Sequence, residues 1–109
     1  MRKSKRIIKT EEYFKVFKDK DLVSLEGLYT SNIRLIDWAN DVTGKKKVLM
    51  LNEDLFKSNF KLEVISTKEL GRKTYNEIKI EIGGESINVF DIITFNDSFK
   101  IENITAYKR

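Results

Sequence analysis

The chain contains no cysteine, no histidine and no proline among its 109 residues. Without cysteine it has no disulfide, no thiol nucleophile and no thiolate metal site. Without histidine it lacks the commonest acid–base group and the commonest metal ligand. Any proton chemistry therefore falls to Asp, Glu, Tyr or Lys, and we expect neither a metal ion nor a cofactor.

Long hydrophobic runs are absent as well. No apolar stretch approaches the roughly 18–20 residues of a membrane-spanning helix. The basic start, MRKSKRIIK, lacks the apolar segment of a secretory signal. We therefore expect a cytoplasmic protein that makes no membrane contact. The chain length and the hydrophobic fraction of 40% suit one globular domain.

The net charge of +4 is unevenly distributed. Five of the basic residues lie among residues 1–9, and the rest of the chain has 16 basic and 17 acidic residues. We expect a flexible basic arm at residues 1–9, followed by a single domain at residues 10–109. Because the domain is nearly neutral, nucleic acid is not an expected partner. The alternative is an anion-binding surface formed by the arm and the lysines at 45–47.

Helical periodicity and capping residues predict three helices. Thr10 is the expected N-cap of the first, which carries Tyr13, Val16 and Phe17 at helical spacing and ends near Lys18. Asp21 is the expected N-cap of a short second helix whose buried side includes Tyr29. The third helix is predicted from Lys45 to about Ser58.

Alternating apolar residues predict five strands, at residues 32–38, 60–69, 74–82, 87–95 and 99–107. Residues 40–44 have the composition of a loop. Gly83-Gly84 predicts a two-residue hairpin turn, because both turn positions require positive φ. In the last strand two registers stay open. Either Ile101, Asn103, Thr105 and Tyr107, or Ile104 and Ala106, face the interior.

An aspartate lies on an otherwise apolar strand face. Asp91 shares its face with Ile87, Val89, Ile93 and Phe95. A carboxyl group in such a place is unfavourable unless it is paired, protonated or facing a cavity. The Gly83-Gly84 turn fixes a register that places Asn76 opposite Asp91, with a hydrogen bond or a shared polar niche. Asp91 therefore contacts Asn76, lies at the solvent-filled lip of a pocket, or faces a ligand.

A second aspartate ends the first predicted strand. Ile33, Leu35 and Asp37 share one face. Asp37 either caps the turn that follows or faces the same interior as Asp91. The neighbouring Trp38 either lines the mouth of a pocket or packs against the protein.

The element order is α, α, β, α and then four strands joined by short turns, which indicates an α+β fold. We predict a cone-shaped α+β barrel, or cystatin-like roll. Three N-terminal helices pack on a strongly curved, mostly antiparallel sheet and leave a pocket. Phe90 and Ile92 lie on the outer face of the fourth long strand and need a partner, which predicts a homodimer through that face.

This layout resembles the nuclear transport factor two-like superfamily, which includes ketosteroid isomerases and SnoaL-like polyketide cyclases. The resemblance covers about residues 10–108. It is carried by the aromatic first helix and by Lys20-Asp21-Leu22, Asn32 to Asp37, Thr43-Gly44-Lys45, Val89 to Phe95, Lys100-Ile101 and Ala106-Tyr107.

The resemblance to the isomerases implies three catalytic positions. Tyr13 and a protonated Asp91 would form an oxyanion hole, and Asp37 would be the base. From its helical spacing alone, Tyr13 also fits a core or pocket-wall residue. Asn52 stands where the isomerases carry a further tyrosine. Lys108 stands where they carry an aromatic residue and, if directed inward, would favour ionised aspartate.

The expected function is binding of a small apolar or carbonyl-containing molecule, with isomerase or cyclase chemistry if the protein is an enzyme. The alternative is a non-catalytic ligand-binding or dimeric assembly module. The expected ligand-binding residues are Phe17, Trp38, Asn52, Phe56, Asn76, Val89, Ile93 and Lys108.

Overall fold

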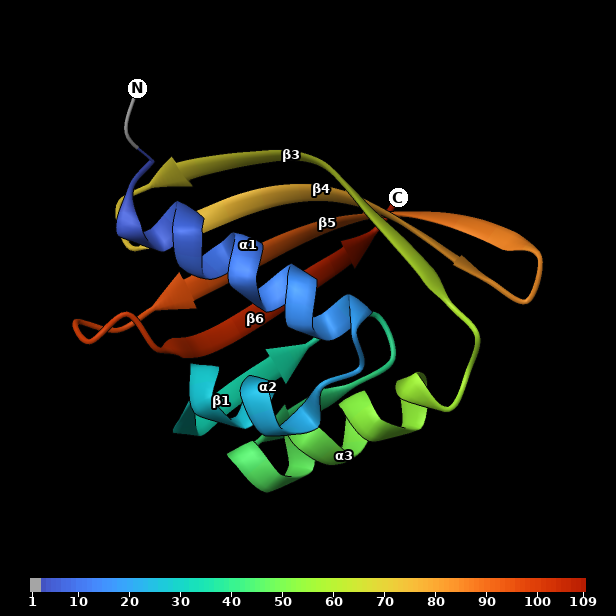
Figure 1. Ribbon diagram of the computed structural model, residues 1–109, viewed down its shortest axis with the longest axis horizontal. Helices are drawn as coiled ribbons and strands as arrows, with labels where there is room; N and C mark the ends of the chain where they lie inside the picture. The colour runs from blue at the N-terminus through green and yellow to red at the C-terminus, as the bar shows by residue number, and fades with distance from the viewer. Residues whose placement is uncertain (1–2) are drawn as a thin grey trace.

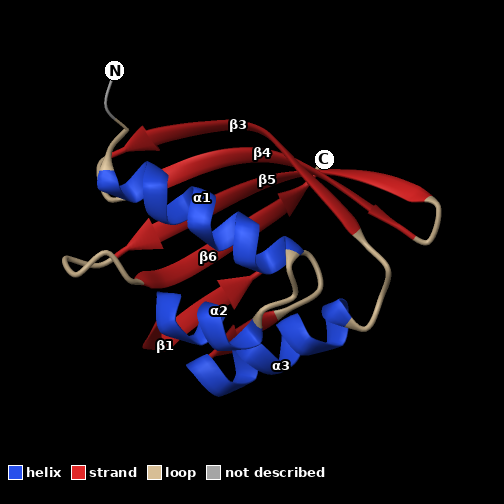
Figure 2. Cartoon of the chain, viewed as in Figure 1, coloured by secondary structure: helices blue, strands red, loops and turns tan. Residues whose placement is uncertain are grey.

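Three helices pack on one strongly curved, unclosed sheet of six strands, as the computed structural model of residues 3–109 shows (Figure 1). The predicted α+β fold is confirmed. Helix α1 crosses the sheet, α3 packs beside β1, and α2 packs against α1 and α3 (Figure 2). The elements are α1 (Lys5–Lys18), α2 (Leu22–Leu28), β1 (Tyr29–Ile36), β2 (Asp41–Thr43), α3 (Lys45–Phe56), β3 (Lys61–Leu70), β4 (Lys73–Ile82), β5 (Glu85–Phe95) and β6 (Ile101–Lys108).

The sheet order is β2-β1-β6-β5-β4-β3. All neighbouring strands are antiparallel except β1 and β6, which run parallel. The parallel pair places the first long strand beside the last. The segment after β1, with Asp37 and Trp38, therefore lies at the same end of the sheet as the C-terminal end of β6.

The predicted hairpin between β4 and β5 is confirmed in its register. Ile78 pairs with Val89, and Asn76 pairs with Asp91. Gly83 and Gly84 form the turn with φ values of 59° and 82°, which residues with a side chain rarely adopt. The turn therefore determines which residues of β5 face the interior.

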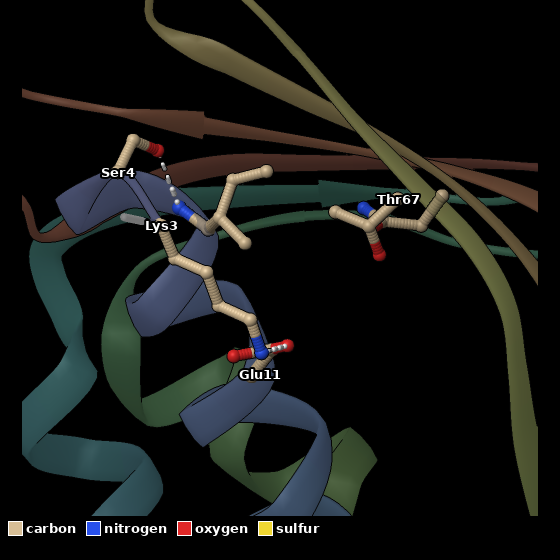
Figure 3. Close-up of polar contacts among 6 residues, drawn as sticks. Lys3, Ser4, Glu11 and Thr67 are labelled. Carbon is tan, nitrogen blue, oxygen red and sulfur yellow. Dashed lines mark hydrogen bonds and ion pairs between the residues drawn. The ribbon is translucent and has the colours of Figure 1, made fainter. Parts of the chain in front are cut away.

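Helix α1 begins earlier than predicted, so the expected N-cap at Thr10 is wrong. Ser4 is the N-cap, and its hydroxyl accepts a hydrogen bond from the Ile7 amide at 3.1 Å. Lys3 reaches along the same helix to Glu11 at 2.8 Å (Figure 3). Residues 5–9 of the expected arm are thus helical, and residues 1–2 lie outside the described part. The start of α1 was not predicted because the basic residues of its first turn give no apolar periodicity.

Thr10 is instead fully buried inside α1. Its hydroxyl donates to the Arg6 carbonyl oxygen and lies 2.9 Å from the Thr74 hydroxyl of β4. Because the Thr10 hydroxyl bonds both the backbone of α1 and Thr74 of β4, it links α1 to the concave face of the sheet.

The N-cap predicted at Asp21 is confirmed. Its carboxylate accepts hydrogen bonds from the Ser24 hydroxyl and amide, which lower the pKa of Asp21. Two boundaries were wrong nearby. Tyr29, placed on the second helix, begins β1, and the loop expected at residues 40–44 contains strand β2. Three residues of pairing against β1 are too few to leave an alternation in the sequence.

A β-bulge interrupts the pairing of β6 with β5 and sets the register of β6. Ile101 pairs with Phe95, whereas Asn103 pairs with Thr94, so one extra residue lies between them. Ile101 and Ile104 are therefore both buried, and neither of the two regular alternations is correct at both ends. Ile104 and Ala106 face inward beyond the bulge.

The core fills the space between α1 and the sheet. Tyr13, Phe14 and Phe17 project from α1, and the Phe17 ring packs edge-on against Phe56 and Phe60 at 5.1 and 5.7 Å. None of the described helices is long and apolar enough to cross a membrane. The core does not fill the whole cone, and the remaining space is the candidate site.

Candidate active site

A cavity of about 250 Å³ lies between the helices and the concave face of the sheet. Its wall is mostly apolar, and its polar groups come from four parts of the fold: α1, the turn after β1, α3 and β5. The lining residues are Tyr13, Phe14, Phe17, Leu35, Asp37, Trp38, Asn40, Leu51, Asn52, Leu55, Leu62, Ile78, Ile80, Ile82, Val89, Asp91, Ile104 and Ala106.

Asp91 projects from the inner wall, formed by β5, and is 5% exposed. Its Oδ1 atom is buried and has no hydrogen-bond partner within residues 3–109. Burial raises the pKa of Asp91 from 3.8 to about 7, because the charged form loses its hydration and gains no partner. Near neutral pH the carboxyl group is therefore readily protonated and able to donate a hydrogen bond.

Asn76 lies opposite Asp91, as predicted, but the hydrogen bond goes to the backbone. Its amide nitrogen donates to the Asp91 carbonyl oxygen at 3.2 Å, and its amide oxygen accepts from the Thr67 hydroxyl at 2.8 Å. Asn76 is fully buried and is not among the cavity-lining residues. It supports the strand behind the cavity and leaves the Asp91 carboxyl group unpaired.

Tyr13 and Tyr29 bring two phenols to the same region. The rings lie 6.4 Å apart, and both side chains are buried. Burial raises the pKa of Tyr13 well above its usual range, and Tyr29 and Asp91 raise it further. Burial likewise raises the pKa of Tyr29. Both phenols therefore keep their protons, and Tyr13, which lines the cavity, remains a hydrogen-bond donor.

Asp37 lies across β6 from Asp91, because Ile36 pairs with Thr105 and Asp91 pairs with Ala106. Beside it, Asn40 and the half-exposed Trp38 form the mouth of the cavity. The Asp37 Oδ1 atom accepts hydrogen bonds from the Ala39 and Asn40 amides at 2.8 and 2.6 Å, and the Asn40 side chain adds a third contact at 3.1 Å. Asp37 thus caps its turn and lines the cavity at once. The two interpretations of this residue were not exclusive.

Seven of the predicted site residues line the cavity together: Tyr13, Phe17, Asp37, Trp38, Asn52, Val89 and Asp91. The other four do not. Phe56 stacks on Phe60 at 6.0 Å, Ile93 and Asn76 are enclosed in the core, and Lys108 is exposed. Lys108 pairs with Val89 at the last position of β6, and it is exposed and does not line the cavity.

The sequence interpretation missed several lining residues. Leu62, Ile78, Ile80 and Ile82 form the apolar wall from β3 and β4. Their alternation was visible, but a strand pattern does not distinguish a residue that touches a cavity from one that packs. Tyr29 was also missed as a site neighbour because it was assigned to a helix.

Metal binding finds no support in the arrangement of the carboxylates. Among residues 3–109, no three Asp or Glu side chains gather closely enough to hold a metal ion. The polar side chains of the cavity are one desolvated carboxyl group, one hydrogen-bonded carboxyl group, one phenol, two amides and one indole. Such a set suits hydrogen bonding and proton transfer.

No family model matches the sequence, and no curated protein matches it either. Solved structures do match. A steroid delta-isomerase from Pseudomonas aeruginosa superposes with a TM-score of 0.82 at 17% identity, covering 98% of this chain and 81% of the other.

Two further structures show the range of the likeness. A nuclear transport factor two-like protein of unknown function from Cytophaga hutchinsonii gives a TM-score of 0.86 at 14% identity, covering 100% and 95% of the two chains. An LEH-like epoxide hydrolase from M. tuberculosis gives 0.79 at 13%, covering 95% and 82%. Identities this low establish the fold alone, and these neighbours differ in chemistry.

Proposed function

We propose that this chain, which has the fold of the nuclear transport factor two-like superfamily, binds a compact, largely apolar carbonyl compound and moves a proton next to that carbonyl. The observation that carries the proposal is the Asp91 carboxyl group. It is buried in an apolar wall, lacks a hydrogen-bond partner among the described residues and has a pKa of about 7. A ligand oxygen would supply the missing partner.

The carbonyl oxygen of the ligand accepts hydrogen bonds from the Tyr13 phenol and the protonated Asp91 carboxyl group. Negative charge develops on this oxygen when a proton leaves the neighbouring carbon. Donors fixed in a water-poor site stabilise that charge more strongly than water does. Their location on α1 and β5, two packed elements, keeps both donors in place.

Asp37 is the proton acceptor. Its Oδ2 atom makes only a 3.2 Å contact with the Asn40 side chain, so a lone pair remains for a C–H proton. The C–H electron pair forms the enolate carbon–carbon double bond, and the carbonyl π electrons move to oxygen. In a β,γ-unsaturated ketone, Asp37 then returns the proton to the γ-carbon, where the β,γ π pair bonds it. The oxygen electrons re-form the carbonyl, and the enolate pair becomes the α,β double bond of the conjugated isomer.

The two aspartates have separate roles because their surroundings differ. Asp91 has no side-chain hydrogen-bond partner among residues 3–109 and readily holds a proton, whereas backbone and side-chain hydrogen bonds hold the Asp37 carboxyl group in place at the cavity lining. The apolar residues between them, including Val89 and Leu35, exclude water from the reacting carbon.

Isomerisation of a β,γ-unsaturated cyclic ketone, followed by ultraviolet absorbance, tests the proposal. We expect Asp37→Asn to lower kcat at least a hundredfold, as removal of a general base usually does. Asp54→Asn, on the exposed side of α3, is the matched control and should leave the rate unchanged. Equal rates for wild type and Asp37→Asn would remove the base assignment.

A binding module without catalysis gives a different result. Ketones would then bind and be released unchanged, and Tyr13→Phe would weaken binding while no isomer formed in any variant. Failure of every ketone to bind would reject the ligand-binding proposal as a whole.

We further propose that two copies associate through the outer face of the sheet. Tyr75 and Phe90 stack there at 6.1 Å, and Tyr107 beside them is 55% exposed. Around them, Glu77 pairs with Arg109 at 3.9 Å, so the margin carries both charges. A twofold copy can approach such a margin without like-charge repulsion.

Sedimentation velocity tests the dimer. Phe90→Lys should convert a dimer to a monomer at micromolar concentration, whereas Val23→Lys on α2, where Val23 is 82% exposed, should not. A wild-type monomer at every concentration reached would contradict this interface.

A further inference from the structure

Asn52 of α3 is a buried amide on the cavity wall that the proposed proton transfer leaves unused. It is 4% exposed and lines the same cavity as Tyr13 and Asp91. Its Oδ1 atom accepts a hydrogen bond from the Tyr29 hydroxyl at 2.8 Å. Tyr29 is itself 2% exposed, so this bond is shielded from water.

The bond to Tyr29 determines which end of the amide remains available. A primary amide has one acceptor oxygen and an NH2 group with two donors. With the oxygen held by Tyr29, the NH2 group is left, and no hydrogen bond links it to any other residue in the described part. The NH2 nitrogen is also not fully enclosed by protein atoms, so it borders the cavity space.

The NH2 group comes from a different element than the other two donors, since Asn52 lies on α3, Tyr13 on α1 and Asp91 on β5. A carbonyl oxygen has two lone pairs, and the hydrogen bonds from Tyr13 and Asp91 occupy both. A single ligand oxygen bound by these two residues therefore leaves Asn52 without an acceptor. A buried donor without an acceptor is unfavourable, and a second ligand oxygen relieves it.

We propose that Asn52 donates a hydrogen bond to a second oxygen of the ligand and thereby selects compact apolar molecules that carry a carbonyl and a further acceptor. This inference rests on the proposed function, because Tyr13 and Asp91 must hold the first oxygen. Tyr29 acts as a positioning residue that fixes the orientation of the Asn52 amide.

The experiment compares ligands that differ in one oxygen. 1-Tetralone has a single carbonyl, and its 3-hydroxy and 4-hydroxy derivatives place a second oxygen at two distances from it. Trp38, the single tryptophan of the chain, lines the cavity mouth, so its fluorescence reports binding in every variant. Comparing affinity ratios between variants cancels the different hydration of the ligands.

For each protein we take the ratio of the affinity for a hydroxytetralone to the affinity for 1-tetralone. For at least one hydroxytetralone, Asn52→Leu should lower this ratio about fivefold to tenfold from its wild-type value. If Asn52→Leu leaves the Tyr29 hydroxyl unpaired and unfolds, the double variant Tyr29→Phe/Asn52→Leu removes both partners and should show the same loss.

Two results would overturn the inference. An unchanged ratio for both hydroxytetralones, with 1-tetralone still bound, would reject the role of Asn52 and leave the proposed function intact. Binding of none of the three ketones would reject both. Conversely, a ratio that depends on Asn52 while Tyr13→Phe has no effect would support the amide and reject the carbonyl assignment.

Discussion

The inner wall and the mouth of the cavity each present one aspartate, and the two are held in opposite ways. Asp91 on β5 is buried, with Oδ1 unpaired within residues 3–109. Asp37, in the turn after β1, accepts hydrogen bonds from two backbone amides and the Asn40 side chain. Burial without a partner raises the pKa of Asp91 and favours the protonated acid, whereas the hydrogen bonds to Asp37 fix the orientation of its carboxyl group.

Position in the fold, rather than residue type, determines what each aspartate can do. β5 is flanked by two strands whose backbone groups are engaged in the ladder, so the Asp91 side chain finds no backbone donor. The turn after β1 leaves its amides free, so Asp37 finds two. One cavity thereby holds a potential hydrogen-bond donor and a potential proton acceptor.

The largest expected effect comes from Asp91→Asn, which removes the titrating group and keeps its shape. The pKa of Asp91 is about 7 in the folded chain and near 3.8 when unfolded. Between these values the folded state binds the proton and the unfolded state does not, so wild-type stability falls as pH rises from about 4 to 7. The loss is at most roughly 4 kcal/mol. Urea denaturation should show a much weaker pH dependence in Asp91→Asn.

The control is Asp37→Asn, which removes the other cavity carboxylate. Its amide oxygen can still accept from the Ala39 and Asn40 amides, so we expect the wild-type pH dependence between pH 4 and 7. If Asp37→Asn flattened the curve and Asp91→Asn did not, the assignment of the two environments would be reversed.

Asn76→Leu is the next largest change, because it alters the support behind the inner wall. Asn76 bonds the Thr67 hydroxyl and the Asp91 carbonyl oxygen, and both would lose a buried partner. We expect the free energy of unfolding to fall by about 2–3 kcal/mol. Lys68→Leu, at an exposed position of β3 that pairs with Tyr75, controls for the introduction of a leucine into the same pair of strands and should have little effect. Equal losses would mean that the Asn76 bonds contribute nothing specific.

The fold was largely predictable because its long elements carry strong local patterns. Gly83-Gly84 fixed the β4–β5 register, and the pairing of Asn76 with Asp91 followed from it. Short or charged elements were not predictable. The first turn of α1 is basic rather than amphipathic, and β2 exists only through its three-residue pairing with β1.

The site was predictable only where a polar side chain lies among apolar residues in the sequence pattern. Asp91 was found because a carboxyl group interrupts an apolar face, and Asp37 because it ends one. The sequence could not show that the Asn76 amide bonds the backbone of Asp91, nor that Tyr29 fixes the Asn52 amide. Each of these bonds joins two residues that are distant in the sequence, Asn76 and Asp91 at a separation of 15 residues and Tyr29 and Asn52 at a separation of 23.

Asp37→Ala is expected to have a smaller effect, at the mouth. The substitution deprives the Ala39 and Asn40 amides of their acceptor, but this turn is partly exposed and water can replace the carboxylate. We expect a loss of about 1 kcal/mol relative to Asp37→Asn, which keeps an acceptor oxygen. Thermal denaturation of the two variants measures the difference. A loss as large as that of Asn76→Leu would show that the mouth is as rigid as the inner wall.

The smallest effect is expected at Lys108, the residue that the resemblance placed near the interior. Lys108 is exposed at the end of β6, and water and salt screen its charge from the Asp91 carboxyl group. We therefore expect Lys108→Met to shift the Asp91 pKa by less than about 0.3 units, measured from the carboxyl carbon-13 chemical shift against pH. A rise approaching one unit would show that the ammonium group stabilises the anion. The Asp91 carboxyl group would then be influenced by the charge of Lys108, and the contrast between the two aspartates would be smaller.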